Sequence, residues 1–257
     1  MTAVPDHLLS ADEPHPVLDY NPSGRSPFFI ACDHYGRLSP RDLGDLGVRE
    51  ADWQRHIAWD IGIAGVATRL ADALDAHLVA QRYSRLVIDC NRPPHAASSI
   101  PVISEATHVL GNEALSAPAR ALRQRAIFAP YHARLAEALD HRQAAKQRTF
   151  LLALHSFTPV YHGIARPWHI GTLYQHDTRL PHRLLAALCK EPGLVVGDNE
   201  PYAVHEDTDY TIPVHGGRRG LVHTGIEIRQ DLIADEAGQS AWAARLAGVL
   251  KEIEPAL

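Results

Sequence analysis

Three short apolar runs, each followed at once by polar and reactive side chains, constrain the fold of this chain more than any other feature. The runs cover residues 27–32, 86–90 and 150–154. The residues that follow them are Asp33-His34, Asn91-Arg92 and His155-Ser156. Continuous apolar runs of this length are typical of strands that are buried on both faces of a parallel sheet. Because ligands bind outside the carboxyl ends of such strands, the pattern predicts a functional site there.

Segments with apolar residues at helical spacing alternate with these runs. We expect helices over 53–76, over 118–141 with a bend or interruption near Pro130, around 184–189 and over 240–253. Further strands are expected at 170–174, at 194–197 and within 220–228. This alternation predicts an α/β fold with a largely parallel central sheet. Residues 1–257 are expected to form a single domain, in which residues 1–26 are an irregular arm on the surface.

Composition narrows the class of protein. A chain of 257 residues with 46% hydrophobic content can bury a core that needs no disulfides. The three cysteines (Cys32, Cys90 and Cys189) are too scattered for a disulfide framework, and their apolar surroundings predict buried structural roles in a reducing, cytoplasmic setting. No signal-peptide pattern or apolar stretch of ~20 residues is present, so no membrane association is expected. The net charge of −5 and the dispersed basic residues argue against a nucleic-acid partner.

The chain has 17 histidines, and their positions relative to the predicted strands identify the candidates for a functional role. His34 and His155 each follow a predicted buried strand, and neutral imidazoles at the edge of a sheet suit a catalytic zinc, which takes three protein ligands and a water. The third ligand is often a carboxylate. Asp60 lies four residues after His56, on the apolar face of the predicted helix, where a carboxylate is costly unless it is paired or bound to a metal. The sequence leaves two roles open for Asp60: a partner in a salt bridge or a metal ligand.

Glu227 lies in a segment where Ile226 and Ile228 alternate with polar positions, which predicts a strand. Its side chain then faces the opposite side from the two isoleucines. It is either an exposed strand carboxylate or a general base beside a metal-bound water, from which it takes a proton for the leaving amine.

Nearly the whole chain, from about residue 26 to residue 250, resembles the N-formylglutamate amidohydrolase family. The stretches that carry the match are CDHYGRLSP (32–40), HIAWDIG (56–62), YSRLVIDCNRP (83–93), LHSFTPV (154–160), RPWHIG (166–171), VGDNEPY (196–202) and IEIRQDLI (226–233). The family is distantly similar to zinc carboxypeptidases and aspartoacylases. The resemblance therefore implies a three-layer phosphorylase/hydrolase-like α/β fold with a mixed, largely parallel central sheet.

The resemblance also implies roles for single residues. By analogy with the carboxypeptidases, His34 and His155 would bind the metal, Glu227 would be the general base, and the Asn91-Arg92 pair would grip the substrate. Those enzymes carry a metal-binding carboxylate three residues after the first histidine, where this chain has Arg37. Asp60 is the first choice for the missing ligand, and His56 and Asp33 are the alternatives.

Together these assignments predict a zinc-dependent hydrolase for a small N-acyl amino acid, with N-formylglutamate as the first substrate and formate and glutamate as the products. Iron, cobalt or manganese also suits a histidine and carboxylate site. Arg92 would stabilise the oxyanion or clamp a substrate carboxylate, because a guanidinium matches a carboxylate with two hydrogen bonds. Further candidates for substrate binding are Arg166, Asn199, Tyr202 and Arg229.

Two other functions are open at this point. One is a zinc peptidase or amidase that acts on a larger substrate, such as a peptide or a cell-wall fragment. The other is a relative that has lost its metal and only binds a ligand, which the presence of Arg37 keeps open.

Overall fold

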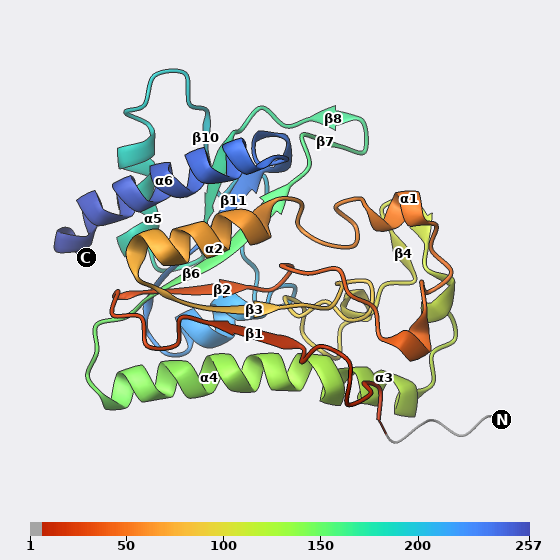
Figure 1. The fold of residues 1–257 in the computed structure, drawn as a ribbon. Coiled ribbons are helices and arrows are strands. Elements are labelled where there is room, and N and C mark those ends of the chain that lie inside the picture. The colour runs from red at the N-terminus through yellow and green to blue at the C-terminus, as the bar shows by residue number, and fades with distance from the viewer. Residues whose placement is uncertain (1–6) are drawn as a thin grey trace.

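A seven-stranded mixed sheet forms the centre of the molecule, and the computed structural model describes it within residues 7–257 (Figure 1). The order of the strands is β1-β3-β2-β6-β11-β9-β10. Their bounds are Val17–Tyr20 for β1, Phe28–Cys32 for β2, His77–Gln81 for β3, Phe150–Phe157 for β6, Ile170–Leu173 for β9, Val196–Asp198 for β10 and Val222–Arg229 for β11. The strands β3, β2, β6 and β11 run parallel, and β1, β9 and β10 run the opposite way. This confirms the predicted fold class.

Helices cover both faces of the sheet (Figure 1). One face carries α2 (Ile63–Leu74), α5 (Arg179–Leu188) and α6 (Glu236–Ile253), and the other carries α4 (Ala129–Ala144). A short helix, α3 (Ala117–Arg123), and a π-helical turn at 124–128 precede α4 and provide the interruption expected near Pro130. The single-turn helix α1 (Glu50–Trp53) and two small hairpins lie at one end of the sheet. The hairpins are β4–β5 (Ile103–Ser104 and Thr107–His108) and β7–β8 (Val160–Tyr161 and Ile164–Ala165). None of the helices in residues 7–257 is long and apolar enough to cross a membrane.

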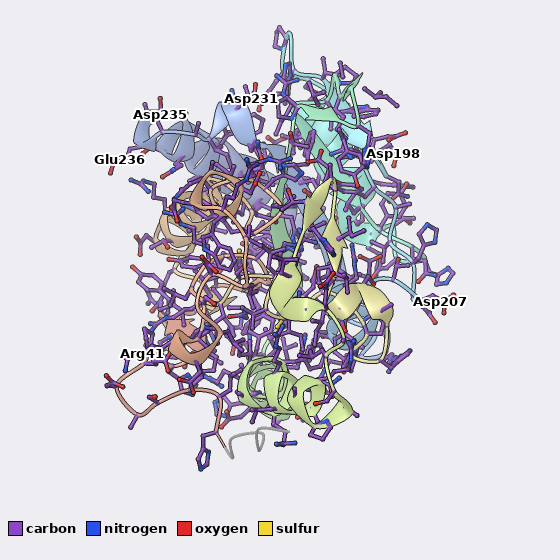
Figure 2. The ribbon with its side chains drawn as sticks, turned by 90° about the vertical axis from the view of Figure 1, so that its right-hand side faces the viewer. Arg41, Asp198, Asp207, Asp231, Asp235 and Glu236 are labelled. Atoms are coloured by element: carbon purple, nitrogen blue, oxygen red, sulfur yellow. The ribbon has the colours of Figure 1, made fainter. Side chains whose placement is uncertain are left out.

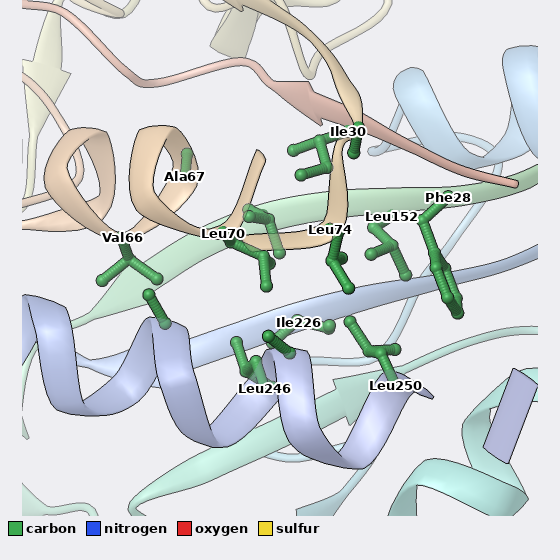
Figure 3. Packing of buried hydrophobic residues seen from close by; sticks show 14 of the residues in the cluster. Phe28, Ile30, Val66, Ala67, Leu70, Leu74, Leu152, Ile226, Leu246 and Leu250 are labelled. Atoms are coloured by element: carbon green, nitrogen blue, oxygen red, sulfur yellow. The ribbon is translucent and has the colours of Figure 1, made fainter. Parts of the chain in front are cut away.

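Alternation along each central strand divides its side chains between two cores. On β2, Phe28 and Ile30 pack under α2 and α6, whereas Phe29 and Ala31 face α4. Figure 3 shows the first core, where Leu246 of α6 faces the sheet beside residues of α2. Burial on both faces explains why these strands are continuous apolar runs in the sequence.

The predicted helix over 53–76 is wrong as a single element. The chain forms α1, then turns from residue 54 to residue 62, and then begins α2. Gly62 has a φ of 79°, and a Cβ there would overlap the backbone of Ile233, so this turn requires glycine. His56 and Asp60 therefore do not share a helix face. Asp60 reaches the sheet from the turn that precedes α2.

Residues 86–90 do not form a strand, contrary to the prediction. Leu86 and Ile88 are fully buried against the α4 side of the sheet, but the Ser84 hydroxyl accepts the N–H of Leu86 and bends the chain into turns. The strand that pairs with β2 on this side is β3. It was not predicted from the sequence, because its apolar residues are flanked by His77 and Gln81.

Two smaller expectations also need correction. The segment 1–26 is not irregular throughout, because β1 (Val17–Tyr20) pairs with β3 at the edge of the sheet. Residues 1–6 lie outside the described part of the chain. Cys32 and Cys90 are buried as predicted, but Cys189 is exposed just after α5.

A buried histidine pair couples the stability of the fold to pH. His132 of α4 and His215 stack with their ring nitrogens 3.0 Å apart, and burial lowers the pKa of His132 to about 4 and that of His215 to about 3. Both values lie below the pKa of an unfolded histidine, about 6.5, so the unfolded chain binds more protons below that pH. The stability that the pair contributes is complete above pH 6.5 and is lost as the pH falls toward 4.

We therefore expect each of the two histidines to lower the free energy of unfolding between pH 6.5 and 4.5, by up to about 1.4 kcal/mol per pH unit. Urea unfolding at several pH values measures this slope. His215→Asn removes one titrating group and should make the slope shallower by about that amount, whereas His182→Asn, at an exposed position, should not. An unchanged slope in His215→Asn would contradict the assignment.

Candidate active site

A cavity of about 570 Å³ opens beyond the carboxyl ends of β2, β6 and β11. Figure 2 looks onto this end of the molecule, and the charged side chains labelled there, such as Asp198 and Asp231, stand at the periphery. Seven of the predicted site residues line the cavity: His34, Asp60, Asn91, Arg92, His155, Tyr202 and Glu227. The cavity is therefore where the strand-end pattern placed it.

Three buried side chains meet at the floor of the cavity with the geometry of a metal site. The Nδ1 atoms of His34 and His155 are 3.2 Å apart. Asp60 Oδ2 lies 3.0 Å from Nδ1 of His155 and 3.5 Å from Nδ1 of His34. A tetrahedral zinc with bonds of about 2.0–2.1 Å separates its ligand atoms by about 3.3 Å. The donor set and its spacing therefore fit a divalent metal.

The outer nitrogens of both histidines face carboxylates. Nε2 of His34 lies 2.8 Å from Asp89 Oδ1, and Nε2 of His155 lies 3.3 Å from Asp33 Oδ2. The Thr211 hydroxyl donates to the other oxygen of Asp33. Metal-binding histidines usually donate their second N–H to such a group, which fixes the ring and its tautomer. Asp33, an alternative ligand in the sequence, thus lies behind His155 rather than among the three ligand atoms.

Asp60 is held in place from two sides. Its Oδ2 accepts the backbone N–H of Ser156 at 3.1 Å, and its Oδ1 lies 3.4 Å from Arg85. Burial alone would raise the pKa of this carboxyl, but His34 and His155 lower it below its usual range, so Asp60 is ionised. Arg85 also pairs with Asp89 at 2.7 Å. The sequence reasoning missed Arg85 and Asp89, although Asp89 interrupts the apolar run before Asn91-Arg92.

Glu227 lies beside the group formed by His34, Asp60 and His155. The parallel pairing of β11 with β6 sets Glu227 opposite His155, so both side chains project from the same face of the sheet. Glu227 is 6% exposed, and its Oε2 has no hydrogen-bond partner among residues 7–257. Burial, assisted by Asp60 and opposed by His155, raises its pKa to about 7. A carboxylate with a pKa near the working pH can both take and return a proton.

The side chains of Asn91 and Arg92 form hydrogen bonds with residues 208–211 of the same chain. Arg92 donates to the carbonyl of Thr208 at 2.7 Å and to Asp209 Oδ1 at 3.2 Å. Asn91 accepts the N–H groups of the two residues that follow Asp209. Both residues line the cavity, and they anchor the segment 208–211 over it.

Arg166 is buried among aromatic rings. Its guanidinium lies over the rings of Tyr161 and Tyr202 at 4.6 and 4.8 Å, and it donates to the Tyr202 hydroxyl at 2.8 Å. Within the described chain it has no carboxylate partner. A buried cation without a counter-charge is costly, so the position suits an anionic group of a ligand. Both tyrosine rings line the cavity, although Arg166 itself stands behind them.

Two other predicted substrate-binding residues, Asn199 and Arg229, are not among the described residues that line the cavity. Each contacts another part of the chain. Asn199 sits in a turn and accepts the N–H of Tyr174. Arg229 pairs with Asp231 at 2.8 Å. His56 does line the cavity, but its Nε2 lies 3.9 Å from Glu105 and outside the metal-binding group. Arg37 stacks over Trp59 rather than facing the ligands.

The sequence profile of the N-formylglutamate amidohydrolase family matches residues 26–234. The chain belongs to the N-formylglutamate amidohydrolase family. It is therefore a hydrolase that acts on an amide bond, as the resemblance implied.

Two solved structures are similar to this chain. The gene product Atu2144 from Agrobacterium tumefaciens is 36% identical, with a TM-score of 0.94 over 97% of this chain and 99% of that chain. An N-formylglutamate amidohydrolase from Ralstonia eutropha JMP134 is 18% identical, with a TM-score of 0.63 over 93% and 99% of the two chains, and shares the fold. No curated protein matches the chain.

Proposed function

We propose that this chain is a metal-dependent amidohydrolase that cleaves the amide bond of an N-acyl amino acid. The observation that carries the proposal is the buried triangle of His34, Asp60 and His155 with the unpartnered Oε2 of Glu227 beside it. These three residues would hold a divalent metal, zinc in the first instance, which would acidify a bound water and polarise an acyl oxygen.

The residues of the chain supply the proton transfers. Glu227 accepts a proton from the attacking water at Oε2 and then donates it to the nitrogen of the leaving amine. Asp89 and Asp33 hold the imidazoles of His34 and His155 in one tautomer. Arg85, buried against Asp60 and Asp89, fixes both carboxylates.

We assign the carboxylate of the substrate to the Tyr202 hydroxyl, which lines the cavity and accepts a hydrogen bond from Arg166 behind it. Arg166 has no carboxylate partner among residues 7–257, whereas Arg92 already pairs with Asp209. Arg92 remains a candidate for the oxyanion if segment 208–211 moves. N-formylglutamate is the first substrate to test, because the family match supports it.

Removal of the metal is expected to abolish hydrolysis, and stoichiometric Zn²⁺ is expected to restore it. The measurement is amine release from N-formylglutamate and other N-acyl amino acids before chelation, after chelation, and after addition of zinc, iron, cobalt or manganese. Full activity of the chelated protein, with no metal by elemental analysis, would contradict metal dependence and favour other chemistry at Glu227.

A larger substrate remains a second candidate for the same site. Cavities of roughly 300–1,000 Å³ hold drug-sized ligands, and the cavity here is about 570 Å³. A peptide or cell-wall fragment in the substrate panel tests this reading. The alternative of a metal-free, ligand-binding relative was based on Arg37, which stands where a metal-binding carboxylate was expected. The grouping of the Asp60 carboxylate with His34 and His155 supports the metal-dependent alternative instead.

A further inference from the structure

The carboxylate behind His34 is hydrogen-bonded to the loop that follows it. Asp89 Oδ1 lies 2.8 Å from Nε2 of His34 and also accepts the backbone N–H of Asn91 at 2.9 Å. The side-chain oxygen of Asn91 in turn accepts the backbone N–H groups of Tyr210 and Thr211, both at 3.1 Å. A continuous hydrogen-bonded path therefore connects His34 to Thr211.

Thr211 also begins a path to the other histidine. Its hydroxyl donates to Asp33 Oδ1 at 2.6 Å, and Asp33 Oδ2 lies 3.3 Å from Nε2 of His155. Asp33 Oδ2 is buried without a hydrogen-bond partner among residues 7–257, so the bond to Thr211 sets how the carboxylate is turned toward His155. Thr211 and Asp33 are both buried, so bulk water does not compete for this bond.

Residues 203–209, here called the cavity segment, are attached to the fold at the same place. Five of them line the cavity. Arg92 donates to Asp209 Oδ1 at 3.2 Å and to the preceding carbonyl at 2.7 Å, and Asp209 Oδ2 accepts the N–H of His205 at 3.0 Å. The middle of the segment is exposed, whereas Thr211 is fully buried. The cavity segment is therefore an exposed turn that ends next to the point where the two paths meet.

We propose that Thr211 and Asn91 are positioning residues of the metal site, and that they couple the cavity segment to the imidazoles of His34 and His155. This role rests on the proposed function, in which the two imidazoles bind the metal. Groups that orient such imidazoles raise the affinity for the metal. When the segment moves, Asn91 and Asp33 lose hydrogen bonds at the same time, so both imidazoles lose support. Because coupling between two equilibria is reciprocal, metal binding should in turn hold the segment in place.

Thr211→Val is expected to raise the Kd for zinc about three- to tenfold, because the isosteric side chain cannot donate to Asp33. This effect is smaller than the ~10–100-fold typical of changes to a group that contacts a metal ligand directly. Thr211→Ser retains the hydroxyl and should restore the wild-type Kd. Competition with a chelator of known zinc affinity measures the Kd without any turnover.

The matched control is Thr149→Val. The Thr149 hydroxyl is also bonded to a charged side chain, since it accepts the Nε–H of Arg142 at 3.1 Å, but it precedes β6 at the end of the strand opposite His155. Its removal should lower the stability of the fold without changing the Kd for zinc. Comparison of the two valine variants thus separates a positioning role from a general loss of stability.

A second measurement is amide hydrogen exchange of residues 205–211 with and without zinc. In the wild type, zinc should slow this exchange by the same factor of about three to ten, because the coupling is reciprocal, and the slowing should be smaller in Thr211→Val. The β7–β8 hairpin lies outside both paths (Figure 1), so its exchange should not depend on zinc. The measurement on the wild type remains decisive if Thr211→Val does not fold.

The possible outcomes are distinguishable. The proposal is overturned by a zinc Kd that is the same in Thr211→Val and the wild type, by an equally large loss in Thr211→Ser, or by segment exchange that zinc leaves unchanged. Wild-type protein that binds no divalent metal contradicts the proposed function, and the coupling falls with it. Wild-type zinc binding and hydrolysis that Thr211→Val leaves unchanged contradict the coupling alone.

Discussion

Glu227→Gln is expected to lower kcat by about 10²–10⁴-fold, the usual contribution of a positioned general base. The amide preserves the size of the side chain and removes its ability to take a proton from water. Glu227 is buried with an unpartnered oxygen, and the ligand atoms come from other residues, so the variant should keep its fold and its metal. The measurement is steady-state hydrolysis of an N-acyl amino acid with metal content determined on the same sample.

The matched control for this variant is Glu191→Gln, at a partly buried surface ion pair with Arg245, which should keep wild-type kcat. Wild-type activity in Glu227→Gln would show that another group accepts the proton. Equal losses in kcat and in bound metal would instead make Glu227 a ligand. The expected pattern is loss of kcat with full metal occupancy.

Two of the three apolar runs are central strands, as predicted, because burial on both faces of a sheet leaves a continuous apolar run in the sequence. Phe28–Cys32 and the first residues of β6 are apolar on both faces, so their identity as central strands was readable. His155 differs in one respect from the expectation, because it lies within β6 rather than after it. Its partner Glu227 could be placed on a strand by alternation, but its position next to His155 required the sheet order.

Asp60 was identified for a reason that the structure does not support. The spacing to His56 placed it on a helix, whereas Gly62 breaks that segment and Asp60 projects from a turn. The inference that its carboxylate needs a partner was correct, since it is buried against both histidines. The carboxylates behind the histidines could not be assigned, because pairs such as His34 with Asp89 form only when separate loops meet. The ion pair of Arg92 with Asp209 is equally non-local, because the two residues are 117 positions apart in the sequence.

His155→Ala is expected to abolish stoichiometric metal binding and, with it, hydrolysis. The histidine provides one of three ligand atoms, and the two that remain, His34 Nδ1 and Asp60 Oδ2, cannot complete a three-ligand catalytic site. Elemental analysis after dialysis against a defined zinc buffer measures the loss. His182→Asn removes an exposed histidine and should leave the metal content unchanged.

Substitution of Asp89 or Asp33, the carboxylates behind the two histidines, is expected to lower metal affinity partially in the same elemental analysis. Asp89→Asn and Asp33→Asn each leave His34, Asp60 and His155 in place. Asp89→Asn weakens the hydrogen bond that orients the His34 ring, and Asp33→Asn removes the charge that faces Nε2 of His155. Such changes typically lower metal affinity by about 10–100-fold. Asp89→Asn should have the larger effect, because Nε2 of His34 lies 2.8 Å from its carboxylate, against 3.3 Å for His155 and Asp33. Two results would contradict this assignment: full metal content in His155→Ala, or a larger loss of metal in Asp33→Asn than in His155→Ala. In either case Asp33 would be the metal ligand and His155 would be the supporting residue.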